Sequence, residues 1–156
     1  MNRKKGKMAN YCEFMMKVKG SKESILSFKE VLERSDKYQS DNILAGLISY
    51  DASDIHSEYA YITGICKWSV HTSFMEGDGT YYSDSLTDKK SFPFTLTNIV
   101  KLAKELDITI EVFGEEPGMG FIEYYLITPQ GVEEDICKDL DFTTRKGIIK
   151  YGAFTI

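Results

Sequence analysis

The chain has 156 residues, of which 42% are apolar and 28% charged, and this composition is typical of one soluble globular domain. Four of its 19 basic residues lie in residues 1–7, which leaves 15 basic against 24 acidic residues in 8–156, a net charge of about −9. An acidic body repels phosphate backbones, so direct binding of DNA or RNA is not expected.

The sequence also indicates where the protein is located and which chemistry its cysteines take part in. It has no run of 18 apolar residues for a membrane span and no apolar segment after the basic N-terminal residues, so we expect a cytoplasmic protein without membrane contact. We expect a disordered basic stub over residues 1–7, with Met8 as an alternative start, and a single domain over residues 8–156. Cys12, Cys66 and Cys137 are odd in number and scattered, which predicts free thiols, at least two of them in the core, and no metal or other cofactor.

The first predicted elements are a strand, a helix and a second strand. Apolar residues alternate from Cys12 to Val18, which is the two-residue period of a half-buried strand. Gly20 ends this strand, and Ser21 caps a helix whose apolar residues recur at helical spacing to about Arg34. A second strand is predicted for Ile43–Ile48.

The longest alternating pattern predicts one strand from Tyr59 to Met75, with a bulge or bend at Gly64 because strands of this length are rare. Residues 76–94 are rich in Gly, Asp, Ser and Thr and are predicted to form a long loop. Thr95 is expected to cap a second helix with an apolar stripe.

The last part of the chain is predicted to form strands joined by tight turns. A strand over Ile108–Val112 is followed by a type II turn over residues 116–119, with glycine at its third position. Strands over Phe121–Ile127 and Val132–Cys137 are expected to form a hairpin around the turn at Thr128–Gly131.

The element order β-α-β-β-α-β predicts an α+β fold, a ferredoxin-like sandwich whose antiparallel sheet carries both helices on one face, with an added C-terminal hairpin. The other face of the sheet is then open. From the alternation we expect this face to be polar and mixed in charge, with Glu13, Met15, Lys17, Lys67, Ser69, His71, Ser73, Thr109 and Glu111 on it.

Four segments resemble the YubB-type ferredoxin-like family, proteins of unknown function often carried by phages, plasmids and other mobile elements of bacteria. They are MANYCEFMMKVKG at residues 8–20, ITGICKWSV at 62–70, TYYSDSLT at 80–87 and IEVFGEEPGMGF at 110–121. The resemblance implies the fold and a mobile-element setting, and it implies no activity. Relatives often carry a histidine where this chain has Tyr124, which argues against a catalytic or metal site at that position.

Two sets of residues are candidate sites. On the open face, Lys17, Lys67, His71 and Glu111 are candidates for a ligand or acid–base site, since a carboxylate near a histidine raises its pKa toward neutrality. A solvated sheet face is the alternative interpretation of the same residues. For partner binding the candidates are acidic residues of the long loop and of the predicted turn: Asp78, Asp84, Asp88, Glu115 and Glu116.

Three functions are left open by these features. The first is a non-enzymatic, protein-binding accessory protein of a phage or mobile element, which inhibits a host defence system through acidic surfaces and whose partner is a host or element-encoded protein. The second is a small-molecule binder or hydrolase-like enzyme that uses the open face. The third is a nucleic-acid-binding regulator that relies on residues 1–7. A homodimer through exposed strand edges is also left open.

Overall fold

The computed structural model describes residues 10–37, 41–55, 58–76, 94–139 and 154–156. Within these residues the chain forms a six-stranded open antiparallel sheet with the strand order β2-β3-β1-β4-β5-β6. The strands are β1 (Tyr11–Lys19), β2 (Leu47–Ala52), β3 (Tyr59–Lys67), β4 (Thr109–Glu116), β5 (Phe121–Thr128) and β6 (Gly131–Asp139). The helices are α1 (Lys22–Lys37), the short π-helix η2 (His71–Met75) and α3 (Ile99–Leu106).

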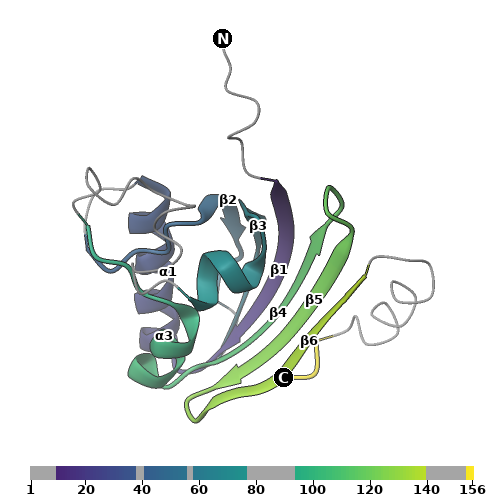
Figure 1. Ribbon diagram of the computed structural model, residues 1–156. Helices are drawn as coiled ribbons and strands as arrows, with labels where there is room; N and C mark the ends of the chain where they lie inside the picture. Colours follow the sequence, from purple (N-terminus) through teal and green to yellow (C-terminus); the bar gives the residue numbers. More distant parts are fainter. Residues whose placement is uncertain (1–9, 38–40, 56–57, 77–93, 140–153) are drawn as a thin grey trace.

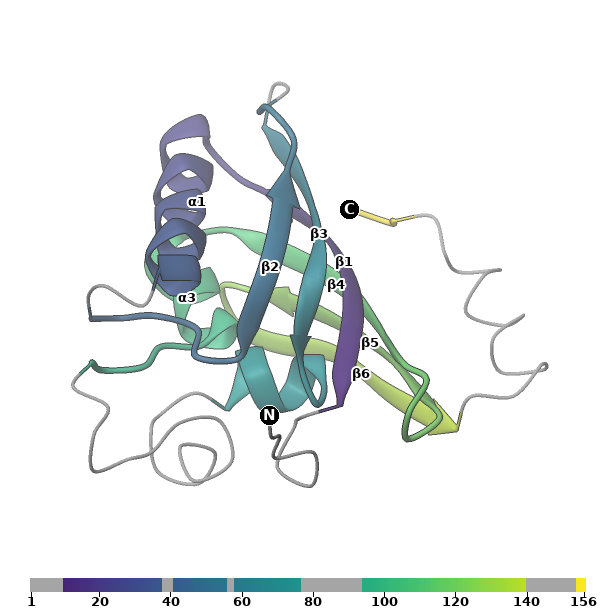
Figure 2. The same cartoon turned by 90° about the horizontal axis from the view of Figure 1, so that it is seen from above.

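Both α-helices lie on the same face of this sheet, as Figures 1 and 2 show. The predicted α+β class is therefore confirmed. The order of the whole sheet is not the ferredoxin-like order that we expected, because β5 and β6 extend the sheet beyond β4. No helix in the described ranges is long and apolar enough to cross a membrane.

The core lies between the sheet and the two helices. Alternate residues of β1 and one face of α1 are buried together, which is what their two-residue and helical periods predict. Each such side chain contributes about 1.5–3 kcal/mol when fully buried. The residues of this pair of elements in the core are Cys12, Phe14, Met16, Val18, Ile25, Phe28, Val31 and Leu32.

The first strand and helix agree with their predictions. The strand is one residue longer at each end than expected, and the Ser21 hydroxyl accepts a hydrogen bond from the Ser24 amide at 3.1 Å, as a helix cap does. The helix continues to Lys37, three residues beyond the predicted end.

The second strand begins later than predicted. Ile43 forms only an isolated parallel bridge with Leu96, and the Leu44 amide donates to the Ser35 hydroxyl on α1 at 2.8 Å. Residues 43–45 are buried, Leu44 is held against α1, and pairing with β3 starts at Leu47.

The third strand is much shorter than predicted, because it ends at Lys67 and η2 follows. Trp68 has a φ of 65°, an unusual conformation for a bulky residue, and it turns the chain out of the sheet. No bulge lies at Gly64: the irregularity is in β2, between Leu47 and Ser49. A Cβ atom at Gly64 would lie 2.2 Å from the Ser49 carbonyl oxygen, so this glycine permits close strand packing.

The second α-helix is capped by Asn98, and the prediction of Thr95 as its cap is wrong. The Asn98 side chain accepts from the Lys101 amide at 2.7 Å. Instead, the Thr95 hydroxyl accepts a hydrogen bond from the Asn42 amide at 3.1 Å. Asp107 ends the helix in the left-handed conformation, with a φ of 55°.

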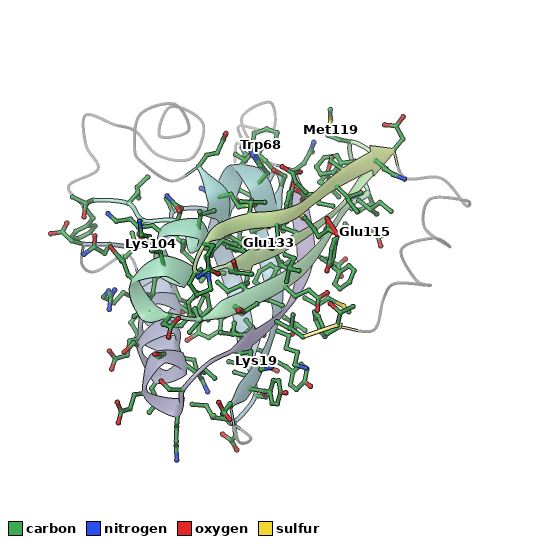
Figure 3. The ribbon with its side chains drawn as sticks, turned by 90° about the horizontal axis from the view of Figure 1, so that it is seen from below. Lys19, Trp68, Lys104, Glu115, Met119 and Glu133 are labelled. Carbon is green, nitrogen blue, oxygen red and sulfur yellow. The ribbon has the colours of Figure 1, made fainter. Side chains whose placement is uncertain are left out.

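The turn between β4 and β5 differs from the predicted type II turn. The Gly120 amide donates to the Glu116 carbonyl at 2.9 Å, and Gly120, not Gly118, has the positive φ, 78°. Met119 is exposed at this hairpin end, where Figure 3 labels it. The second hairpin is confirmed, with Thr128 paired to Gly131.

Candidate functional site

The open face of the sheet is formed by side chains that point away from the helices. Strand register aligns them in rows across the sheet. In Figure 2 the helices lie on one side of the sheet and the C-terminal residues on the other. One row contains Ser49, Ile65, Glu13, Glu115 and Ile122; the next Asp51, Thr63, Met15, Phe113 and Tyr124; and the third Tyr61, Lys17, Glu111 and Leu126.

A groove of about 740 Å³ lies over the first two rows. Carboxylates of three strands line it, and apolar side chains form its floor. Within the described part of the chain, no lysine, arginine or histidine lines it. We call it the acidic groove and define it by Glu13, Asp51, Glu115, Met15, Ile65 and Phe113.

Two of these carboxylates are direct neighbours. Glu13 and Glu115 are opposite each other in the β1–β4 register, and Figure 3 labels Glu115 among the side chains of the sheet. A concentration of negative charge attracts cationic groups, and apolar walls suit an apolar stem. The groove is therefore suited to a cationic group with an apolar body.

The third row is covered by residues 154–156, and Glu111 is central to this contact. Its side chain is 0% exposed and accepts hydrogen bonds from the Thr155 amide at 2.7 Å, the Thr155 hydroxyl at 2.8 Å and the Tyr124 hydroxyl. Burial raises the pKa of Tyr124, and the hydrogen bond to Glu111 raises it further, so the phenol stays protonated as a donor.

Lys17 and two aromatic rings complete this contact. The Lys17 ammonium lies 4.1 Å from the centre of the Tyr59 ring and donates to the main-chain oxygen of Ile156. Phe154 packs between Phe113 and Tyr61, with ring centroids 5.5 and 6.0 Å apart. We call this the tail cradle, formed by Lys17, Tyr61, Glu111, Phe113 and Tyr124.

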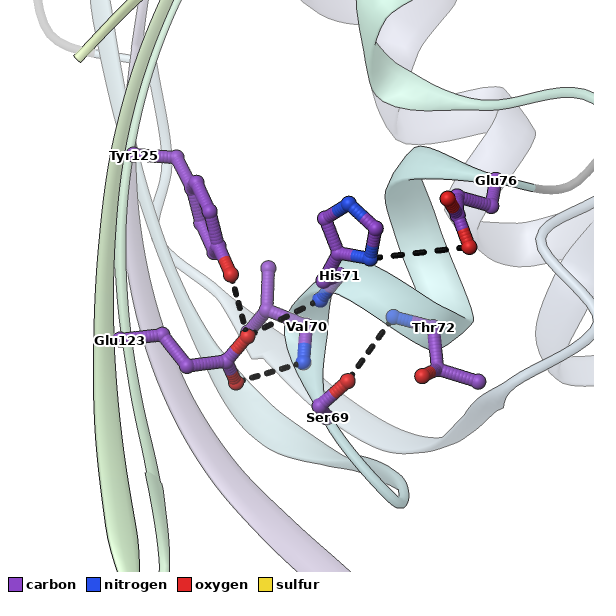
Figure 4. Close-up of polar contacts among 7 residues, drawn as sticks. All are labelled: Ser69, Val70, His71, Thr72, Glu76, Glu123 and Tyr125. Carbon is purple, nitrogen blue, oxygen red and sulfur yellow. Dashed lines mark hydrogen bonds and ion pairs between the residues drawn. The ribbon is translucent and has the colours of Figure 1, made fainter. Parts of the chain in front are cut away.

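A second buried carboxylate, Glu123, lies on the helix face of the sheet (Figure 4). Its side chain is 1% exposed and accepts from the Val70 amide at 2.8 Å, the His71 amide at 3.1 Å and the Tyr125 hydroxyl at 2.7 Å. These donors all belong to the fold itself, and the carboxylate binds the first amides of η2, so this cluster stabilises a helix start. Gly114 leaves the space for it, since a Cβ there would lie 2.8 Å from a Glu123 oxygen.

The buried thiol of Cys12, near Glu123, is not activated. Cys12 donates weakly to Glu123 at 3.6 Å, and its hydrogen bond with Cys66, together with burial, raises the pKa of Cys12. A raised pKa keeps the thiol protonated, whereas a nucleophilic cysteine needs a thiolate. The predictions that all three cysteines are free and that Cys66 lies in the core are confirmed.

The four predicted open-face ligands are only partly brought together. Lys17 and Glu111 are opposite each other in the β1–β4 register. Lys67 ends β3, and burial lowers its pKa. His71 is not on the open face: η2 carries it to the helix side, where its ring centroid lies 6.1 Å from that of Tyr125 and its Nδ1 is 3.6 Å from a Glu76 oxygen. The expectation for Ser69 and Ser73 fails for the same reason, since both follow the end of β3.

The acidic residues that were predicted to bind a partner do not share one environment. Glu115 lines the acidic groove. Glu116 is 1% exposed, and its carboxylate accepts from the Gly118 amide at 2.8 Å and from the Met119 amide, so its side chain belongs to the turn and is not offered to a partner. The other candidates, Asp78, Asp84 and Asp88, lie outside the described residues.

Several residues of these sites were missed from the sequence. Alternation placed Glu13 on the open face, yet only strand register shows that it faces Glu115. Asp51 lies beyond the predicted second strand, Ile43–Ile48, because the strand begins and ends later than expected. Phe154 and Thr155 lie outside every predicted element, and no local signal connects them with a strand some 40 residues earlier.

Neither metal ligation within the described residues nor comparison with known proteins assigns a function to the chain. In the ranges that the structure describes, no three or more histidine, cysteine, aspartate or glutamate side chains are grouped to hold a metal ion. No protein-family model, curated protein or solved structure was found to match this chain. The YubB-type resemblance therefore stays a prediction.

Proposed function

We propose that this protein is a non-enzymatic binding protein whose acidic groove binds a basic and partly apolar segment of another protein. The observation that supports this is the groove itself, about 740 Å³ in volume, with three carboxylates around an apolar floor. Binding pockets typically measure about 300–1,000 Å³ and combine apolar walls with a few polar groups.

Lysine and arginine side chains fit these walls. Their aliphatic stems pack on apolar surface while the charged head stays at the rim, and an arginine head can bind a carboxylate with two hydrogen bonds. In the groove the stem would contact Met15 and Phe113, and the head would lie near Glu13 and Glu115. Complementary charge also raises the rate of encounter with a basic partner.

The biological setting of this proposal comes from the resemblance and the acidic composition. We retain as a hypothesis that the partner is a host or element-encoded protein and that the chain is an accessory protein of a phage or mobile element acting against host defence. We further infer that β1, α1, β2, β3, α3 and β4 correspond to a ferredoxin-like core to which β5 and β6 are added. The order of these elements along the chain supports this inference.

The other two functions have less support. An acid–base site on the open face would lack His71, which lies on the helix side. The alternative that rests on the basic residues 1–7 depends on a segment outside the described ranges.

The test is a selection of peptides from a random displayed library on the intact chain and on two matched double variants. Glu13→Gln with Glu115→Gln removes two groove charges, and Glu23→Gln with Glu105→Gln removes two exposed charges from the helices. We expect the intact chain and the helix variant to enrich peptides in which lysine or arginine adjoins apolar residues. The groove variant should retain those peptides at least about tenfold less well, because each lost charge-assisted contact is worth about 1.5–3 kcal/mol.

Equal retention by the groove variant would contradict the proposal, as would peptides without basic residues. Measuring the selected peptides at two salt concentrations gives an independent check, since attraction at an exposed groove weakens as salt rises.

A further inference from the structure

The contact between residues 154–156 and the open face has the chemistry of peptide recognition. We propose that the tail cradle is a second peptide-binding site, which recognises an extended aromatic–threonine–isoleucine segment, and that such a segment of a partner protein replaces residues 154–156. This site is distinct from the acidic groove and takes a neutral segment, whereas the groove takes a basic one.

Glu111 determines which chemical groups an occupant of the tail cradle must offer. A carboxylate with no exposed surface is costly unless its oxygens are hydrogen-bonded. Two of the three hydrogen bonds described for it come from Thr155, through the amide and the hydroxyl, and the third comes from Tyr124. The site is therefore satisfied by an occupant that offers a main-chain N–H and a hydroxyl on one residue.

The neighbouring positions add an aromatic ring and a main-chain oxygen to this requirement. Tyr61 and Phe113 flank the ring of Phe154. Lys17, 9% exposed and held over the Tyr59 ring, donates to the main-chain oxygen of Ile156. Three consecutive residues thus make three different contacts, which specify the order of side chains in an occupant.

The present occupant lies on the sheet and is not part of it. Residues 154–156 belong to no strand; Thr155 is exposed, and Phe154 and Ile156 are half-buried. An occupant held in this way can leave without breaking the hydrogen bonds between strands. Phe113 borders both the tail cradle and the acidic groove, so a longer partner segment can extend from one into the other.

The test uses the full chain with Phe154→Ala and Thr155→Ala, which removes the ring and hydroxyl contacts of the resident segment, keeps only its main-chain contacts and leaves the strands unchanged. The probe is a fluorescent peptide with the sequence of residues 150–156, KYGAFTI, and binding is measured by fluorescence polarisation. We expect this variant to bind the probe at least about tenfold more tightly than the unmodified chain, where the resident segment competes. Adding Glu111→Gln to the variant should weaken binding by about tenfold or more.

A second probe keeps the result independent of folding. A peptide with valine in place of threonine has nearly the same shape but lacks the hydroxyl, and it should bind about tenfold more weakly to the same protein. Absence of probe binding to the Phe154→Ala, Thr155→Ala chain, or equal binding of the two peptides, would overturn the proposal. Glu13→Gln with Glu115→Gln should change probe affinity by less than about twofold, so the two proposals fail separately.

Discussion

At the scale of single residues, two buried carboxylates on opposite faces of the sheet have different roles. The donors to Glu123 come from η2, β1 and β5, and the arrangement is fixed by the fold. Two of the donors to Glu111 come from Thr155, near the end of the chain. The sequence alone distinguishes neither of them from a solvated glutamate, because most of their donors lie far away in the chain.

Replacing Glu123 by alanine should lower the free energy of unfolding by about 3 kcal/mol or more. The amides of Val70 and His71 and the hydroxyl of Tyr125 would lose their acceptor, and each buried donor left unsatisfied costs about 1–3 kcal/mol. Urea denaturation measures the loss. Glu105→Ala on the exposed side of α3 is the control and should stay within about 0.5 kcal/mol. A Glu123→Ala chain as stable as this control would show that Glu123 is not needed to cap η2.

At the scale of elements, alternation predicted β1 well and β3 poorly, for a physical reason. Both flanks of β1 are paired, with β3 and β4, so its period of two describes real neighbours along its whole length. The pattern continues past Lys67, but the left-handed Trp68 and the capture of the next amides by Glu123 turn that stretch into η2. Hydrophobic periodicity cannot predict a local conformation that depends on a hydrogen-bond partner some 50 residues away.

The cap of α3 gives a test at this scale. Asn98→Ala should destabilise the protein by about 1 kcal/mol, because the Lys101 amide loses its acceptor, whereas Asn98→Asp keeps an acceptor and should be nearly neutral. Thermal unfolding of the two variants checks this difference. If aspartate and alanine cost the same, the side-chain hydrogen bond does not contribute.

At the scale of the whole molecule, the α+β class and the placement of both helices on one face were predictable from element order, whereas the position of the added hairpin was not. Which strand the hairpin joins depends on β4 pairing with β5, a contact across a turn whose place the sequence predicted but whose type it did not. The open face was foreseen as polar. Its acidic groove could be located only from strand register. The tail cradle is contacted by residues 154–156, which no sequence pattern marked.

The stability of the whole molecule should fall at high pH. Burial, and then Glu123, raise the pKa of Tyr125 above its ordinary value of 10.0. The folded state therefore keeps this proton when the unfolded state has lost it, so the contribution is complete below about pH 10 and decreases above it. We expect a slope of up to about 1.4 kcal/mol per pH unit from this group. Urea unfolding between about pH 9 and 11 measures it, and Tyr125→Phe should reduce the slope; an unchanged slope would contradict the assignment.

Among the described residues β6 is an outermost strand of the sheet, and it carries consecutive negative charges. Glu133, Glu134 and Asp135 are consecutive and exposed on this strand. An antiparallel pairing of two copies centred on Glu134 would place Glu133 of one against Asp135 of the other, and opposed like charges resist such pairing. The homodimer left open by the sequence is therefore disfavoured along this edge. The outer backbone of β6, unpaired within the described residues, therefore favours a strand with basic side chains over a second copy of itself.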